Sequence, residues 1–199
     1  MSDVTAVMLG AAGRRPAPGG VASVMEVSSL DALADTAREA ATGLLWLLDA
    51  SAQPSEETLP ALLELAEAPA ASLPVDERDA PVEPLLGRFT ESDVPGILSA
   101  AANRCVPLRH TYLISLLVER DLVTMLAPPD PDRFGRYAGS EWTARLFARR
   151  RGMLVPASRV RVGALAARAP GPALRMARTG VWRRGETLRE LQRALQRAA

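Results

Sequence analysis

An unbroken apolar run, Leu44 to Leu48, limits the possible folds more than any other feature of the chain. The run closes at Asp49 and is too short for a helix of its own, so it predicts a strand buried on both faces. Such a strand needs helices packed above and below its sheet, as in an α/β layered domain with a mainly parallel sheet. The chain has 199 residues, which is enough for one domain of this kind.

Strand and helix patterns surround this run. Val4–Leu9 and Val21–Val27 are short apolar segments that predict two earlier strands. A helix is expected from Ser29 to Gly43, with an inward face at helical spacing: Leu30, Leu33, Ala37 and Ala41. A second helix is expected from Ser55, and its inward face is Leu59, Leu62, Leu63 and Ala66. The order strand, strand, helix, buried strand, helix favours parallel strands joined by crossovers.

The second half of the chain continues this alternation after an irregular excursion at residues 68–96, which are rich in proline and acids. The remaining elements are expected, in chain order, as a short strand at Ala70–Leu73, a buried strand at Thr111–Val118, a helical stretch at Glu119–Met125, a helix at Glu141–Arg151 and a strand pair at Met153–Val162 broken at Pro156. From residue 164 the pattern changes to an Arg-rich amphipathic helix. We therefore expect one domain over residues 1–163 and a basic helical extension over residues 164–199.

Charge is distributed unevenly, although 24 basic and 23 acidic residues nearly cancel. Residues 1–100 hold 5 Arg and 16 acidic residues, whereas residues 101–199 hold 19 Arg and 7 acidic residues. The net charges of the two halves are therefore −11 and +12. This asymmetry predicts a polarised surface, or an anionic partner for the second half. Because few aromatic residues and no binding motif accompany the basic charge, the sequence argues against nucleic acid as that partner.

Single copies of Cys105 and His110 exclude an intramolecular disulfide and any metal centre built from several cysteines or histidines. His110 is expected in a surface loop after Arg109. No stretch approaches the roughly 20 apolar residues of a membrane-spanning helix, and the start of the chain lacks the pattern of a secretory signal. The expected location is therefore the cytoplasm.

Two blocks of sequence carry a resemblance to a known family. Leu30–Leu65 leads from a helix through an alanine-rich turn and Gly43 to the apolar strand, then to Asp49, Pro54 and the next helix. The later block adds Asp132 and Phe134, then Glu141, an Arg-Leu helix and a strand with a Val-Pro step. In this order and separation, the two blocks resemble family 2 glycosyltransferases, which have the GT-A fold.

The resemblance implies a GT-A-like α/β domain and an inverting transfer of a sugar from a nucleotide sugar to a glycan or lipid-linked acceptor. The implied setting is cell-envelope or polysaccharide biosynthesis. Asp49, with Ser51, would meet the diphosphate and a Mg²⁺ or Mn²⁺ ion that acts as a Lewis acid. Glu141 would be the general base for the acceptor hydroxyl. Gly10 and Gly13 follow the first strand and would let the backbone approach a phosphate.

The chain departs from the family pattern at its acidic positions. Ser51 stands where the pattern has a second Asp, and Gly139 and Ser140 stand where it has paired acids. These changes support a second hypothesis, a catalytically inactive relative that binds a partner enzyme or a sugar ligand. In that case Asp49 caps a turn, and Glu141 pairs with Arg145 at i,i+4.

Three alternatives stay open for the basic extension at residues 164–199. It packs on the domain, attaches to an anionic membrane surface, or contacts a partner glycosyltransferase. Membrane attachment would place the protein at the inner face of the membrane.

Overall fold

A computed structural model of the chain describes residues 3–10, 18–65, 67, 69–82, 88–89 and 105–162. Three of the sequence-based expectations fall outside these residues: the site role of Gly13, the inward face at Ala66, and the basic extension at 164–199. Within the described part of the chain, no helix is long and apolar enough to cross a membrane.

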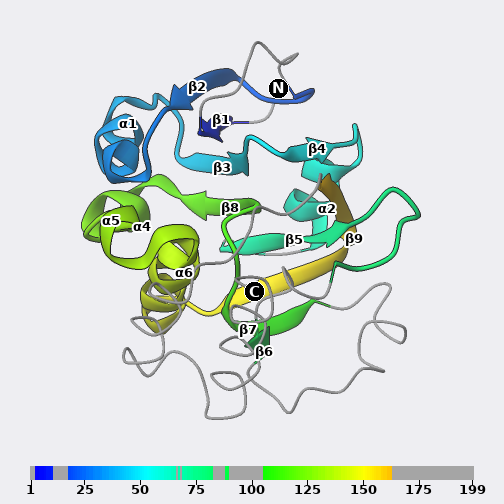
Figure 1. Cartoon of the computed structure of the whole chain (residues 1–199). Helices are drawn as coiled ribbons and strands as arrows, with labels where there is room; N and C mark the ends of the chain where they lie inside the picture. The colour runs from blue at the N-terminus through cyan, green and yellow to red at the C-terminus, as the bar shows by residue number, and fades with distance from the viewer. Residues whose placement is uncertain are drawn as a thin grey trace, which may run out of the picture.

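One mixed sheet organises the described residues, with the strand order β2-β1-β3-β8-β5-β9-β7-β6 and β4 paired to β9 (Figure 1). The strands are β1 (Val4–Leu9), β2 (Ser23–Val27), β3 (Leu44–Asp49), β4 (Ala52–Pro54), β5 (Ala70–Val75), β6 (Arg88–Phe89), β7 (Val106–His110), β8 (Ser115–Glu119) and β9 (Gly152–Val162). Strands β1, β2, β3, β5, β6 and β9 point one way, while β4, β7 and β8 point the other way. The predicted α/β class with most strands parallel is therefore confirmed, although β8 enters antiparallel between β3 and β5.

Helices cover both faces of this sheet. They are α1 (Leu33–Glu39), preceded by a 3₁₀ turn at Leu30–Ala32, α2 (Thr58–Leu65), α4 (Arg120–Met125), α5 (Pro131–Phe134) and α6 (Ala138–Arg149). Figure 1 shows α1, α4 and α6 on one side of the sheet and α2 on the other. The layered arrangement predicted from the Leu44–Leu48 run is thus present.

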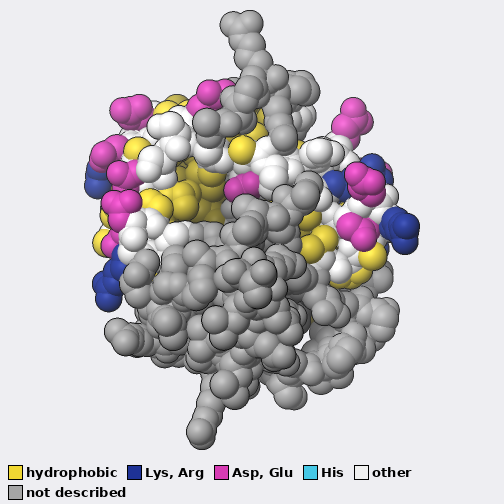
Figure 2. Space-filling model, in the orientation of Figure 1, with side chains coloured by type: hydrophobic (Ala, Val, Ile, Leu, Met, Phe, Trp, Pro, Cys, Tyr) yellow, Lys and Arg dark blue, Asp and Glu magenta, His cyan; other side chains and the backbone are white. Residues whose placement is uncertain are grey.

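Acidic side chains are prominent on the described surface, as Figure 2 shows at the edge formed by α1 and around the loop that follows β5. The exposed acids there are Asp31, Asp35 and Glu39 on α1 and its preceding turn, and Glu77 and Asp79 in the loop. This distribution agrees with the excess of acids in the first half of the chain.

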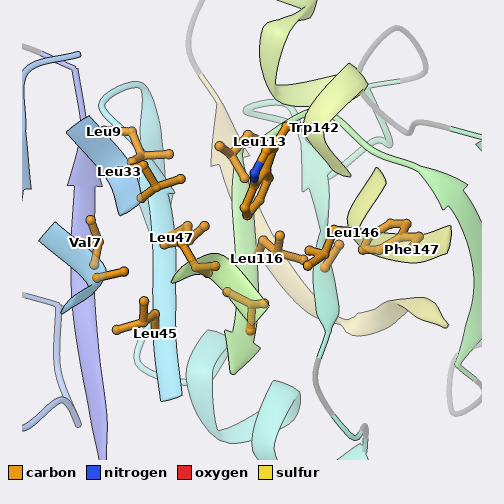
Figure 3. Packing of buried hydrophobic residues seen from close by; sticks show 14 of the residues in the cluster. Val7, Leu9, Leu33, Leu45, Leu47, Leu113, Leu116, Trp142, Leu146 and Phe147 are labelled. Atoms are coloured by element: carbon orange, nitrogen blue, oxygen red, sulfur yellow. The ribbon is translucent and has the colours of Figure 1, made fainter. Parts of the chain in front are cut away.

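The core consists of two hydrophobic layers, one on each side of β3. Leu45 and Leu47 point toward the layer under α1, α4 and α6, where Trp142 and Leu146 pack against the sheet (Figure 3). Trp46 and Leu48 point toward the layer under α2. All four strand residues are at most 1% exposed, so the prediction of a strand buried on both faces is confirmed.

Strands β5 and β9 need correction, because both continue past a proline. The strand expected to end at Leu73 extends to Val75, and the pair expected to break at Pro156 is one continuous strand. Strand β8 pairs only with the first two residues of β5. Beyond them, residues 81–82 bridge to that side of β5, and Val82 N donates to Pro74 O (2.9 Å), a bond that needs no N–H from Pro74. Pro156 lies in a register shift of the β5–β9 pairing. Proline has no backbone N–H, and at neither position does a ladder hydrogen bond depend on one.

Two helix predictions are wrong in detail. Helix α1 ends at Glu39 and the chain is extended at Ala40, so Ala41 is exposed rather than inward. On α2, Leu59 and Leu62 are buried as expected, but Leu63 is 39% exposed. Ser29 precedes the 3₁₀ turn without capping it, and a hydrogen bond from its side chain lowers the pKa of Asp31.

A chain of buried hydroxyl groups crosses the sheet on the α2 side. Trp46 Nε1 donates to Ser115 Oγ (3.0 Å), and Ser115 Oγ lies 2.7 Å from Ser72 Oγ. Ser72 Oγ lies 2.9 Å from Ser158 Oγ, which donates to the carbonyl of Thr58 (2.8 Å). Because each hydroxyl has one proton, Ser72 must donate to Ser158 and Ser115 to Ser72. This hydroxyl chain therefore donates in one direction, from Trp46 toward Thr58, and links β3, β8, β5, β9 and α2.

Candidate functional site

Gly10 and Asp49 are neighbours at one edge of the sheet. Leu9 and Asp49 are register partners at the ends of the parallel strands β1 and β3, and Ala50 N donates to Leu9 O (2.9 Å). Gly10 has φ +97°, and a Cβ added to it would lie 3.5 Å from the Cβ of Ala50. This backbone conformation favours glycine, which leaves main chain rather than a side chain beside Asp49.

This edge is also the place where the order of strands reverses. The chain passes from β1 to β2 on one side, then returns through α1 to β3 on the other side of β1. In α/β sheets, ligands bind outside the carboxyl ends of the strands at such a switch point. The structure thus brings together two of the predicted site residues, Gly10 and Asp49, where a ligand is expected.

Asp49 forms a turn with Ser51, the next predicted site residue. Its Oδ1 accepts hydrogen bonds from the backbone N of Ser51 (2.8 Å) and from Ser51 Oγ (2.5 Å). Asp49 N itself donates to Ile114 O (2.9 Å), which fixes the end of β3 to the segment before β8. The hypothesis that Asp49 caps a turn is confirmed, and Oδ2 is the carboxylate oxygen that this turn does not use.

The donor set at this edge does not fit the Mg²⁺ or Mn²⁺ ion that the resemblance implies. These ions take several oxygen ligands, most of them carboxylate, carbonyl or water. The Asp49–Ser51 turn offers one carboxylate oxygen and a hydroxyl that already donates to the same carboxylate. Over the part of the chain that the structure describes, no group of three or more His, Cys, Asp or Glu residues could hold a metal ion.

Glu141 lies in the first turn of α6 and is held by Arg145. Arg145 Nε is 2.9 Å from Glu141 Oε1, and Arg145 Nη2 is 3.0 Å from Oε2, so the pair is bidentate. The same guanidinium donates to the carbonyls of Ala127 (2.9 Å) and Pro128 (3.3 Å). The predicted i,i+4 pair is confirmed, and it also fastens the segment after α4 to α6.

Gly139 and Ser140, which stand where the pattern of the resembling family has paired acids, are packed inward. A Cβ on Gly139 would lie 2.7 Å from the Cβ of Leu113. Ser140 is fully buried, and its Oγ lies 2.7 Å from His110 Nδ1. The two positions therefore face the core of the protein, and a carboxylate at 139 has no room.

His110 was expected in a surface loop, and this expectation is wrong. It is the last residue of β7 and is 2% exposed. The signal that was missed is the alternation of Val106, Leu108 and His110, which are the buried residues of this strand. Pro107 and Arg109, which alternate with these buried residues, make the segment resemble a loop.

The segment before β8 connects the two halves of the site. Ile114 accepts the bond from Asp49 N, and its neighbour Leu113 packs against Gly139 at the start of α6. Figure 3 shows Leu113 beside Trp142 of the same helix. The structure therefore joins Asp49 and the start of α6 through adjacent residues, while the carboxylate of Glu141 is directed to Arg145.

A mostly parallel sheet with an antiparallel strand inserted beside β3, helices on both faces and a polar turn at the end of β3 define a GT-A-like glycosyltransferase fold. Among solved structures, the chain is similar to the mannosyltransferase PcManGT from Pyrobaculum calidifontis in complex with GDP-Man and Mn²⁺. The TM-score is 0.54 at 13% identity, over 98% of this chain and 73% of that one.

A second similar structure is GalNAc-T7 with UDP, GalNAc and Mn²⁺, with a TM-score of 0.45 at 16% identity. The match covers 71% of this chain and 32% of that protein, so the chain spans about a third of its length. No protein-family model and no curated protein matches the chain. The likeness to the mannosyltransferase structure confirms the expected GT-A-like fold.

Proposed function

We propose that this chain is a glycosyltransferase-like protein that binds a nucleotide sugar at the edge formed by Gly10 and Asp49. The observation that carries the proposal is the meeting of these two residues at the switch point of the sheet. Bare backbone at Gly10 allows a phosphate to approach closely, and Asp49 and Ser51 offer oxygen atoms for the rest of the ligand. The similar mannosyltransferase structure contains a nucleotide sugar, GDP-Man.

Binding is tested by thermal unfolding of the full chain with UDP, GDP and their sugar conjugates, with and without Mn²⁺. A ligand at 100 times its Kd is expected to stabilise the protein by about 2.7 kcal/mol, which raises Tm. Gly10→Ala should abolish this shift, because the added Cβ covers the bare backbone that a phosphate would approach. Strain at φ +97° also lowers the Tm of the unliganded variant, so each shift is measured from the variant's own unliganded Tm. Gly43→Ala is the matched control and should keep the shift, since nothing lies within 4 Å of the added Cβ. If no nucleotide shifts Tm in either condition, the proposal fails.

A second candidate function is the inverting transfer of the sugar to a glycan or lipid-linked acceptor in cell-envelope or polysaccharide biosynthesis. The observation that favours it is an acid, Glu141, on the first turn of α6, where Gly139 packs against the segment that holds Asp49. In this candidate Glu141 is the general base. Its ion pair with Arg145 and the packing at Gly139 favour binding without transfer as the primary proposal.

Glu141→Gln and Arg145→Gln distinguish the two candidates. Both substitutions break the same partly buried ion pair, which should lower the free energy of unfolding by about 0.5–1 kcal/mol. Arg145→Gln should cost more than Glu141→Gln, because it also removes the bonds to the carbonyls of Ala127 and Pro128. If Glu141 is the base, Glu141→Gln alone should lower nucleotide release from a nucleotide sugar by about 10²–10⁴-fold. If the chain binds without transfer, neither the wild type nor either variant releases nucleotide in the presence of acceptor.

A further inference from the structure

The Asp49–Ser51 turn differs from a cation site in how its oxygens are used. Asp49 Oδ1 already accepts two hydrogen bonds from Ser51, at 2.8 and 2.5 Å. The Ser51 hydroxyl gives its single proton to this carboxylate, so it stands as part of the turn rather than as a second charged ligand. Both main-chain groups at the end of β3, Asp49 N and Ala50 N, are bonded to neighbouring segments, which holds the turn in place.

The remaining oxygen, Asp49 Oδ2, is an acceptor with a negative charge. A carboxylate that no cation neutralises repels a diphosphate but accepts a strong hydrogen bond from a hydroxyl. Nucleotide sugars carry hydroxyl groups on the ribose and on the transferred sugar. The chemistry of this oxygen therefore suits a ligand hydroxyl better than a diphosphate bridged by a metal ion.

We propose that the Asp49–Ser51 turn binds a hydroxyl group of the ligand through Asp49 Oδ2, and that binding at this site is independent of divalent cations. The nucleotide part of this inference rests on the proposed function. Whether the turn binds a divalent cation is measured separately, because that experiment needs the protein and the cation but no nucleotide.

The first experiment titrates the full chain with Mn²⁺ alone and follows the loss of free Mn²⁺ by electron paramagnetic resonance. The wild type should show no saturable binding that depends on Asp49, and Asp49→Asn should behave in the same way. Ser51→Asp introduces a second carboxylate and should gain Mn²⁺ binding, while the neutral control Ser51→Asn should not. Saturable Mn²⁺ binding by the wild type that Asp49→Asn removes would overturn the proposal, whether or not the Ser51 variants fold.

The second experiment measures the Kd of UDP, GDP, UDP-sugar and GDP-sugar ligands by calorimetry, in EDTA and in Mn²⁺. For the wild type, Kd should change by less than about threefold between the two conditions. Asp49→Ala should weaken binding by about tenfold or more, because it removes a hydrogen bond to a charged acceptor.

The comparison of ligands identifies the hydroxyl. If Asp49→Ala weakens the binding of the nucleoside diphosphates, the partner of Asp49 is a ribose hydroxyl. If it weakens only the binding of the sugar conjugates, the partner is a hydroxyl of the transferred sugar. Binding that requires Mn²⁺, or an unchanged Kd in Asp49→Ala, would overturn the inference. If no nucleotide binds at all, the proposed function and the hydroxyl contact both fail, and the Mn²⁺ titration still decides the part that concerns cations.

Discussion

Gly139→Ala is expected to lower the free energy of unfolding by about 1–3 kcal/mol, which is the usual cost of overpacking a core. The added Cβ would lie 2.7 Å from Leu113 Cβ and 3.4 Å from Leu113 N. These atoms belong to or adjoin the main chain, so they cannot turn away as the end of a flexible side chain would. Alanine favours a helix over glycine by up to about 1 kcal/mol, and the steric cost should exceed this gain. Urea unfolding followed by circular dichroism measures the difference.

Gly43→Ala is again the matched control, because its Cβ meets nothing within 4 Å and its φ is not left-handed. Its stability should stay equal or rise slightly, since alanine reduces the entropy of the unfolded chain. Gly139→Asp, which introduces an acid where the family pattern has one, should be more destabilising than Gly139→Ala because it also buries a charge. A Gly139→Asp protein as stable as the wild type would show that this position does accommodate a carboxylate, and the steric argument would be wrong.

Local patterns predicted the parts of the fold that depend on neighbouring residues. The Leu44–Leu48 run predicted β3 because a strand buried on both faces has no polar positions. The Glu141–Arg145 pair followed from helical spacing, and the Asp49 turn from its place after a strand. In the last two cases the interacting atoms are within four residues of one another, and in the first the pattern lies within one strand.

Long-range pairing decided what the sequence could not predict. Pro74 is tolerated because β8 pairs only with the first two residues of β5, and nothing near Pro74 in sequence reveals this. The packing of Gly139 depends on Leu113, and the burial of His110 on Ser140, each about 30 residues away.

The meeting of Gly10 and Asp49 was predictable because parallel strands end at the same edge.

Ser115→Ala is expected to lower the free energy of unfolding by about 1–3 kcal/mol, the cost of leaving a buried polar group without a partner. The hydroxyl of Ser115 accepts from Trp46 Nε1 and donates to Ser72 Oγ. Trp46 is 1% exposed, so water cannot replace the lost acceptor without opening the core. Ser28→Ala is a control on an exposed serine and should stay within about 0.5 kcal/mol of the wild type.

A double-mutant cycle with Trp46→Phe assigns this cost to the indole N–H. Phenylalanine removes the donor, so Ser115→Ala should cost less in the Trp46→Phe background than in the wild type. The cavity left by the smaller ring is present in both proteins of that background and cancels in the comparison. If the two substitutions are additive, the hydrogen bond from Trp46 to Ser115 does not contribute to stability. A positive coupling of about 0.5–3 kcal/mol would show that the bond from Trp46 to Ser115, the first link of the hydroxyl chain, stabilises the pairing of β3 with β8.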